Sequence, residues 1–518
     1  MPSSKTQGTD ILVLGGGTNG LACAARLAQA GHRVTVLESE ACTGGAARGW
    51  DFAPGFRTPG MAQVLHLMDP RVIKGLGLTL DLSPLPSIAL SASGDHLTFD
   101  GTFGSSLTGA TEAEAKAWVE LRARLLRFAG VLSPMKQMAP PRLASGAGNE
   151  TLKLLKLALK MRLLGADDFR ELLRMLLINV WDVLEDELTD PRLKGLLAFD
   201  TTLGTWLGPR SPNSLILLLN RLAGEVDGRQ AALALPKGGM EAVALAMTTA
   251  AKSAGVTVRT GAKVARILVE NDRAVGILLE SGEDLRATQI VSALSPKTTL
   301  LSLVGPRLLD NGLVTRLRHQ KSRGAAAKLH LALTGLPDFR GADLKARLVI
   351  APSSNAVESA FNPVKYGEVP SAPVMEILLP SLDDPALAPP GHHVLSAIVQ
   401  YAPHAPKAGE DTARAQMLEA CLSQLEAYAP GIRARVAHAE LLMPYDIEAR
   451  FGMQGGNWHH GELSVEQMLF LRPLAELAQY RTPIDGLWLA GAGSHPGGGI
   501  SGAAGWNAAE ALLKAGKA

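Results

Sequence analysis

The sequence predicts an α/β protein whose parallel-sheet domain is assembled from both ends of the chain, with an α+β domain and a helical cap inserted between them. Two glycine-rich segments carry this prediction, at residues 15–20 and 491–502 of a 518-residue chain. Each follows a short apolar run that is typical of a buried parallel strand. A chain of this length is too long for one simple core, so we expect two closely connected domains.

The first glycine-rich segment lies inside a complete strand–helix–strand unit. The pattern predicts a strand at 10–14, a helix at 21–28 and a second strand at 33–37, which ends at Glu38. Strand, glycines, helix, strand and acidic residue therefore occur in the order of a Rossmann-type dinucleotide site. The alternative is a glycine-rich turn in an ordinary α/β fold.

Each residue type in this unit has a physical role. Gly15 permits the tight turn, Gly17 lets the backbone approach a pyrophosphate, and Gly20 lets the helix pack closely on the strand. The helix N-terminus faces the phosphates, and Glu38 accepts hydrogen bonds from the ribose hydroxyls, which argues against a 2′-phosphate. We expect nucleotide contacts at Gly15, Gly17, Thr18, Asn19, Gly20, Glu38 and Ser39.

A second glycine pair, Gly44 and Gly45, favours FAD over NAD. It follows Glu38 by about six residues and resembles the second signature of two-domain FAD oxidoreductases, which lies along the flavin diphosphate. Many members have arginine directly after the pair, whereas this chain has Ala46 there and Arg48 later. We expect FAD contacts from Ala46 and Arg48, with a surface salt bridge as the alternative for Arg48.

Composition and charge exclude several classes of protein. Lysine and arginine number 51 against 49 acidic residues, without basic clusters interleaved with aromatics, so we expect no nucleic-acid partner. The three cysteines form no CxxC or CxxxxC pair, so we expect neither a redox-active disulfide nor a metal site. The sequence has no apolar signal segment and no run of about 18 apolar residues, so we expect no membrane span. We expect a cytoplasmic protein, with peripheral membrane contact as the alternative and a mitochondrial location in a eukaryote.

Residues 105–230 have a helical pattern with two features of interest. Residues 133–149 interrupt the pattern, and we expect a long mobile loop there. Residues 151–164 form an expected amphipathic helix with Lys153, Lys156 and Lys160 on one face. It suits a cap over an apolar substrate tunnel, which we favour, or a contact with an anionic membrane surface. Residues 172–184 are expected to be core.

The remaining segments alternate strands and helices. A helix to about 253 and strands at 256–260, 264–270, 274–280 and 289–293 return to the nucleotide-binding domain. Strands at 325–333, 347–350, 374–379 and 393–400 and a helix at 412–427 predict a substrate domain. We divide the chain into a flexible tail (1–9), an FAD-binding domain in three parts (10–104, 231–298 and 481–518), a helical cap (105–230) and a substrate domain (299–480).

The closing segment imitates the first one without repeating it. Residues 486–490 are an expected strand and residues 502–514 an expected helix, but no second strand or ribose acid follows. We therefore expect this segment to complete the first sheet and to direct its helix N-terminus at the flavin ring. The expected contacts are Gly491, Gly493, His495, Pro496, Gly498, Ile500, Ser501 and Gly502.

Residues 10–49, 236–293 and 486–513 together resemble the carotenoid and retinoid oxidoreductases, a family of FAD enzymes that includes phytoene desaturases. The segments 44–47, 455–461 and 495–509 are similar to one subgroup, named after pyridine nucleotide-disulfide oxidoreductase domain-containing protein 2. The resemblance implies a two-domain flavoprotein fold, as in amine oxidases and phytoene desaturases. It also implies an adenine contact through the backbone near Val264.

Two histidines are candidate proton donors or acceptors. His460 lies in a glycine-flanked loop, with His459 and Glu462, and matches the subgroup's histidine. His495 lies inside the closing glycine segment. For both residues the alternative is structural, with the ring packed on the flavin or hydrogen-bonded within its loop.

These features predict an FAD-dependent oxidoreductase that transfers hydride to flavin N5 from a small lipophilic substrate such as a polyene or isoprenoid. The open alternatives are flavin-dependent isomerisation without net redox change and a non-catalytic FAD-binding regulator. An amine oxidase would need an aromatic cage, and only Trp458 and Trp506 lie near the flavin motifs. The substrate, the electron acceptor and the oligomeric state are not predicted.

Overall fold

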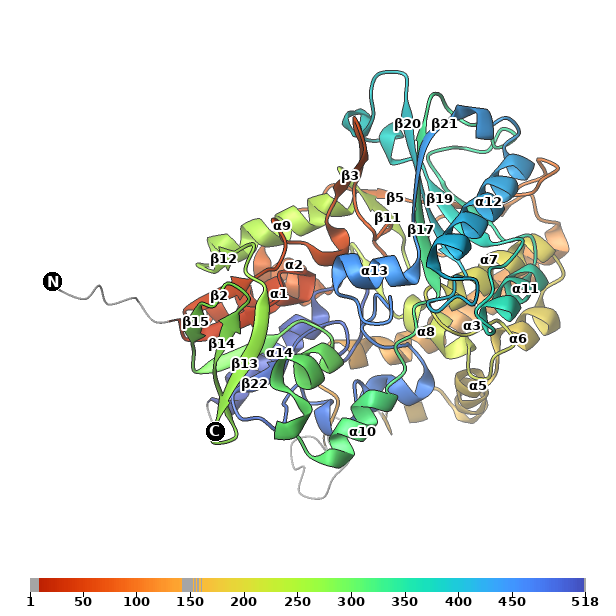
Figure 1. The fold of residues 1–518 in the computed structure, drawn as a ribbon. Coiled ribbons are helices and arrows are strands. Elements are labelled where there is room, and N and C mark those ends of the chain that lie inside the picture. Colours follow the sequence, from red (N-terminus) through yellow and green to blue (C-terminus); the bar gives the residue numbers. More distant parts are fainter. Residues whose placement is uncertain (1–8, 142–151, 153–154, 156–157, 160, 517–518) are drawn as a thin grey trace.

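A five-stranded parallel sheet joins both ends of the chain, as expected. The computed structural model describes residues 9–141, 152, 155, 158–159 and 161–516. The strand order is β12 (Thr257–Arg259), β2 (Val34–Leu37), β1 (Ile11–Leu14), β16 (Gln289–Ser292) and β22 (Leu487–Leu489). All four pairings are parallel, and Ile11 lies between Val34 and Gln289. The C-terminal strand thus extends the sheet that the N-terminal strand begins (Figure 1).

Three helices from distant parts of the sequence pack together on this sheet: α1 (Thr18–Gln29), α9 (Gly239–Ser253) and α14 (Ala503–Ala515). Small residues allow the close approach. A Cβ on Gly505 would lie 1.8 Å from the Asn19 carbonyl oxygen, and one on Gly20 would lie 2.0 Å from the Gly15 carbonyl oxygen. The short helix α2 (Pro70–Leu76) and the antiparallel sheet of β13 (Val264–Glu270), β14 (Arg273–Leu279) and β15 (Asp284–Arg286) complete this half.

An eight-stranded sheet forms the second half of the molecule (Figure 1). Its order is β21 (Val436–Leu442), β17 (Ala326–Leu333), β20 (His393–Gln400), β19 (Val374–Leu378), β18 (Arg347–Ile350), β6 (Ser87–Ala89), β7 (Leu97–Asp100) and β8 (Ser106–Thr108). The expected boundary at residue 104 is therefore wrong, because β6 pairs in parallel with β18 and carries residues 87–108 into this sheet. A domain made of separate segments has no local signal at such a crossing.

Alternation along the central strands gives the eight-stranded sheet two different faces. Leu329, Leu331, Met375 and Ile377 pack in the same core as buried residues of α12 (Glu410–Tyr428). The intervening positions point the other way because side chains alternate along a strand. They include three buried charged residues, Lys328, Arg347 and Glu376.

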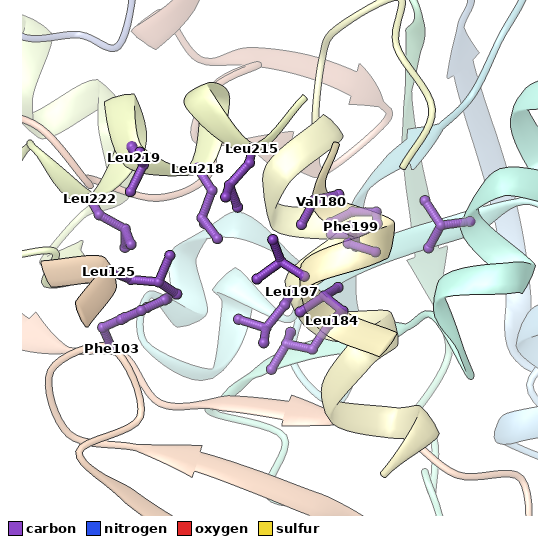
Figure 2. Close-up of a cluster of buried hydrophobic side chains, with 14 of the residues drawn as sticks. Phe103, Leu125, Val180, Leu184, Leu197, Phe199, Leu215, Leu218, Leu219 and Leu222 are labelled. Carbon is purple, nitrogen blue, oxygen red and sulfur yellow. The ribbon is translucent and has the colours of Figure 1, made fainter. Parts of the chain in front are cut away.

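A bundle of helices covers the charged face. It contains α3 (Glu112–Lys136), α5 (Ala166–Leu177), α6 (Val180–Glu187), α7 (Pro191–Thr202), α8 (Leu215–Leu222) and α11 (Ser354–Val364). Figure 2 shows its core, in which Leu125, Leu184, Leu197 and Leu218 from four different helices meet. The expected core at 172–184 is largely present, although Leu173 and Leu177 are exposed.

The expected loop at 133–149 begins too early. Helix α3 continues through Pro134 to Lys136, and residues 142–149 lie outside the described part of the chain. Tertiary contacts hold this last turn, because the Met135 carbonyl accepts a hydrogen bond from His495 and the Lys136 carbonyl accepts one from Asn507. These contacts offset the helix hydrogen bond that a proline cannot donate.

The amphipathic segment 151–164 is described only in part, and its three lysines lie outside the described residues. Leu152, Leu155, Leu159 and Leu163 are each more than half exposed, at 57%, 59%, 56% and 77%. Met161 and Leu164 pack against the helical core. The segment therefore presents a row of leucines outward rather than burying them over a tunnel. Within the described residues, no helix has the length and apolar character needed to cross a bilayer.

The remaining elements are short. They are the helices α10 (Asn311–His319) and α13 (Pro444–Phe451) and the paired strands β3 (Trp50–Ala53) with β4 (Phe56–Thr58), β5 (Leu82–Pro84) with β11 (Ala234–Pro236), and β9 (Glu225–Val226) with β10 (Arg229–Gln230).

Candidate functional site

Glu38 is fixed at the carboxyl end of β2. Its side chain is largely buried, and one carboxylate oxygen accepts a hydrogen bond from the Gly16 amide at 2.7 Å. The other oxygen accepts bonds from the Ser39 hydroxyl at 3.1 Å and the Glu40 amide at 3.0 Å. Each carboxylate oxygen has two acceptor positions, so the oxygen bound to Gly16 retains one position for a ribose hydroxyl.

The glycines beside Glu38 leave an open channel at the start of α1. Gly17 bridges Gly44 in parallel, and a Cβ on Gly17 would meet only the Gly45 Cα, at 4.0 Å. The first amides of α1 have no partner inside the helix, and the Asn19 side-chain oxygen is buried without a hydrogen bond. The amides at the start of a helix, beside a glycine with open space, suit a pyrophosphate.

Ala46 and Arg48 have different surroundings in the structure. Ala46 lines a cavity beside the closing segment. Arg48 forms an ion pair with Glu40 at 2.6 Å, which is the surface salt bridge considered as the alternative. Val264 begins β13 just beyond Ala262, whose amide donates to the Glu38 carbonyl at 2.8 Å, so it lies near the ribose end of the channel.

The closing segment lies against the same edge of the sheet. A Cβ on Gly491 would lie 2.4 Å from the Ala293 carbonyl oxygen, and one on Gly493 would lie 2.4 Å from the Pro296 ring. Gly502 adopts a left-handed conformation and directly precedes α14. The Ser501 hydroxyl accepts a hydrogen bond from the Ala503 amide at 3.2 Å.

A cavity of about 160 Å³ lies where the glycine segments meet the charged face of the eight-stranded sheet. One wall consists of Ala46, Pro496, Gly498, Gly499 and Ile500. Apolar side chains from several elements form much of the remainder, among them Met61, Leu67, Leu203, Leu217 and Ile398. Residues 46–67 near the start of the sequence and residues 496–500 near its end thus line one space.

A larger hollow of about 890 Å³ lies at the other end of the parallel strands, beside Ile11, Gln289 and Leu487. In open α/β sheets, ligands bind outside the carboxyl ends of the strands. The smaller cavity lies on that side, together with every glycine-rich segment, so we assign the site there.

The structure distinguishes the neighbouring histidines 459 and 460. His459 lines the cavity, its Nε2 accepts a hydrogen bond from the Trp458 indole at 3.0 Å, and its Nδ1 has no partner. His460 has φ of +55° and does not line the cavity, and burial, followed by Arg472, lowers its pKa to about 4. The sequence pattern favoured His460, whereas in the structure its neighbour His459 lines the cavity.

His495 has a packing role in this structure. Its ring is buried, and Nε2 donates a hydrogen bond to the Met135 carbonyl at 2.7 Å. Burial lowers the pKa of His495 to about 4, so the ring is neutral at physiological pH. The bond connects the closing segment to the end of α3, which is the structural alternative stated for this residue.

Arg472 is fully buried and connects the histidine loop to the closing segment. Its guanidinium donates to the His459, Gly461 and Ala492 carbonyls at 2.5, 3.2 and 2.8 Å. It also donates to two further carbonyls, and none of these acceptors is a carboxylate. The residue holds the loop that carries His459 in place.

The sequence patterns missed the polar half of the cavity. Lys136, Asp200, Arg221, Glu376 and His66 line it. These residues come from three helices, one strand and one loop, and they match no local motif. The available signal was a charged residue at a single position of an apolar strand, as at Glu376 within residues 374–378.

His66 lines the cavity close to the closing glycines. Its Nε2 lies 3.5 Å from the Cβ position of Gly499. Burial, and then the charges of Arg221, Lys136 and Arg347, lower the pKa of His66 to about 3. The imidazole is therefore neutral at physiological pH.

Relatives resemble this chain over nearly its whole length. Pyridine nucleotide-disulfide oxidoreductase domain-containing protein 2 from Rattus norvegicus is 30% identical over 98% of this chain and 93% of its own. Hydroxyneurosporene desaturase from Cereibacter sphaeroides is 30% identical over 97% of each chain.

Solved structures share the fold. An oxidoreductase from Methanosarcina mazei superimposes with a TM-score of 0.61 at 17% identity, covering 98% of this chain and 100% of that one. Cyclohexylamine oxidase from Brevibacterium oxydans gives 0.57 at 16% identity, covering 98% and 99%. The model of the family described as flavin containing amine oxidoreductase matches residues 20–513. The chain belongs to this family and is an FAD-dependent oxidoreductase of the phytoene desaturase-like type.

Proposed function

We propose that this enzyme dehydrogenates a carbon–carbon bond in a largely apolar substrate of the isoprenoid or polyene class. The cavity next to the glycine segments carries the proposal, because apolar side chains form much of its lining. The names of two relatives specify desaturation of hydroxyneurosporene and dehydrogenation of limonene. Bound flavin supplies a hydride acceptor, and the protein orients the substrate against it.

The chain's own residues account for the remaining proton. Removal of hydride from one carbon leaves the neighbouring carbon to release a proton, and a nearby base must take it. His66 and His459 are the neutral imidazoles that line the cavity. We assign the proton to His66, because its Nε2 lies 3.5 Å from the Cβ position of Gly499, whereas the Nε2 of His459 already accepts the hydrogen bond from the Trp458 indole.

An amine substrate is less well supported. Among the described residues that line the cavity, Trp458 is the one phenylalanine, tyrosine or tryptophan. Its indole N–H donates a hydrogen bond to His459. A cage for an amine needs aromatic faces on both sides.

Anaerobic mixing tests the proposal. The purified holoenzyme is mixed with limonene, with neurosporene and with cyclohexylamine, and the visible flavin absorbance is followed. We expect one of the hydrocarbons to bleach the flavin and cyclohexylamine to leave it oxidised. Bleaching by the amine alone would contradict the proposal. If a hydrocarbon is converted while the flavin stays oxidised and no electron acceptor is present, the enzyme is an isomerase.

His66→Ala serves as the matched variant in this experiment. We expect it to retain flavin and to slow bleaching by about 100-fold, which is typical for loss of a proton acceptor. His438→Ala, at an exposed position on β21, is the control and is expected to bleach at the wild-type rate.

A further inference from the structure

The charges around the cavity do not balance among the described residues. Cations outnumber carboxylates in and directly behind its wall. The cations are Lys136, Arg221, Lys328 and Arg347, and the carboxylates are Asp200 and Glu376. An unbalanced charge in such surroundings is costly unless a ligand neutralises it.

Arg347 uses both carboxylates. Its guanidinium lies 2.5 Å from an Asp200 oxygen and 2.6 Å from a Glu376 oxygen, and all three side chains are buried. Lys328 donates to the amide oxygen of Gln63 at 2.6 Å. Burial holds the pKa of Lys328 well below its usual range, which favours the neutral amine over the ammonium.

Arg221 is left without a full partner. Its Nη2 is buried and forms no hydrogen bond, and its distance to the Asp200 carboxylate is 3.5 Å. That carboxylate already accepts the shorter bond from Arg347. Arg221 also lines the cavity.

Lys136 is a second basic group without a carboxylate partner, and burial lowers the pKa of its ammonium to about 7, which a bound anion would raise. Its side chain is 7% exposed, and its ammonium donates to the backbone carbonyl of Asn220. No described carboxylate forms an ion pair with Lys136. Asn220 is the sequence neighbour of Arg221, and both line the same cavity as Lys136.

We propose that Lys136 and Arg221 bind a carboxylate on one end of the substrate. This deepens the proposed function and rests on it, because the substrate then has an apolar body next to the flavin and an anionic head beside α3 and α8. A carboxylate offers two acceptor oxygens, one for the ammonium and one for the guanidinium. Both positive charges would then be paired.

The same arrangement couples binding to the chemistry. After burial, Arg221 and Lys136 are the leading charges that disfavour protonated His66. A carboxylate bound to both cations offsets their effect, so the proton acceptor becomes more basic when substrate is present.

Binding of simple probes tests the inference without turnover. The FAD-loaded enzyme is titrated with hexanoate and with hexanamide, its uncharged counterpart, and perturbation of the flavin spectrum reports binding. We expect hexanoate to bind about tenfold or more tightly than hexanamide, as charge-assisted hydrogen bonds imply. Equal affinity of the two probes would overturn the inference.

Two variants assign the preference to these residues. Lys136→Met and Arg221→Met are each expected to reduce the hexanoate preference to about threefold or less. Lys345→Met, at an exposed position, is the control and should keep the full preference. Unchanged preference in both cavity variants would also overturn the inference.

Thermal stability separates ligand binding from a structural role. We expect Lys136→Met to retain or raise Tm, because it removes a buried ammonium without a carboxylate partner. A lower Tm with the hexanoate preference intact would assign Lys136 to the fold. An enzyme that binds hexanoate selectively but is not reduced by hydrocarbons would contradict the proposed function and leave this inference standing.

Discussion

The carboxylate of Glu38 binds the Gly16 amide at 2.7 Å and thereby fixes the turn that approaches the cofactor. One side chain thus fixes this turn, and we expect it also to accept a hydrogen bond from the ribose. Sequence reasoning identified it because its spacing from the glycines is local. Sequence reasoning did not identify His66, Lys136 and Arg221, because only tertiary folding brings them together.

Replacement of Glu38 tests this double role. Glu38→Gln keeps the shape but loses charge, so we expect FAD affinity to fall about tenfold or more. Flavin release, followed by fluorescence during dilution, measures the change. Glu283→Gln, in a surface ion pair with Arg259, is the control, and flavin retention equal to wild type in Glu38→Gln would contradict the assignment.

The buried Arg347 cluster makes a separate prediction about stability. Asp200→Asn leaves Arg347 with one carboxylate and increases the excess of positive charge, so we expect a loss of about 3–5 kcal/mol in unfolding free energy. Urea unfolding measures it. Asp411→Asn, whose side chain is 98% exposed in a surface pair with Arg414, should change stability by less than about 1 kcal/mol.

The pH dependence of this cluster follows from its charges. Burial raises the pKa of Asp200, but Arg221 and Arg347 outweigh burial and leave it below its ordinary value. A lowered carboxylate pKa stabilises the fold above the unfolded pKa of about 4, and the contribution is lost as pH falls through the folded pKa. The difference between wild type and Asp200→Asn should therefore be constant near neutral pH and shrink in acid. A difference that grows in acid would contradict this origin.

Among the elements, strands and helices with a clear period were predicted well. The strands at 347–350 and 393–400 coincide with β18 and β20. The predictions failed where tertiary contacts override local signals. Pro134 lies inside α3 because His495 and Asn507 bind its last turn, and β6–β8 join a sheet whose other strands are distant in sequence.

The leucine row of residues 152–163 is the element that predicts a membrane contact. Its exposed leucines, with Lys153, Lys156 and Lys160 in the same segment, suit an anionic lipid surface. We expect Leu155→Ser combined with Leu159→Ser to lower cosedimentation with phosphatidylglycerol vesicles by about tenfold. Leu245→Ser, at an exposed leucine of α9, is the control. Equal cosedimentation of the double variant and the control would refute the contact.

At the scale of the whole molecule, the paired glycine segments were the decisive signal. They predicted that strands from both ends share one sheet, and β1 and β22 flank β16 in that sheet. The residues that line the substrate cavity were not predicted from the sequence. They come from α3, α7, α8 and the charged face of a second sheet, which are distant from one another along the chain. Alternation along each strand is local, but the face that meets the flavin depends on how the two sheets pack.

The central claim is that the enzyme removes two hydrogen atoms from an apolar substrate at this cavity. A single anaerobic turnover with limonene and with neurosporene, analysed by mass spectrometry, tests it most directly. We predict a product lighter by two hydrogen atoms, formed in an amount equal to the flavin that is reduced. Reduced flavin without such a product, or a product of unchanged mass with oxidised flavin, would contradict the claim.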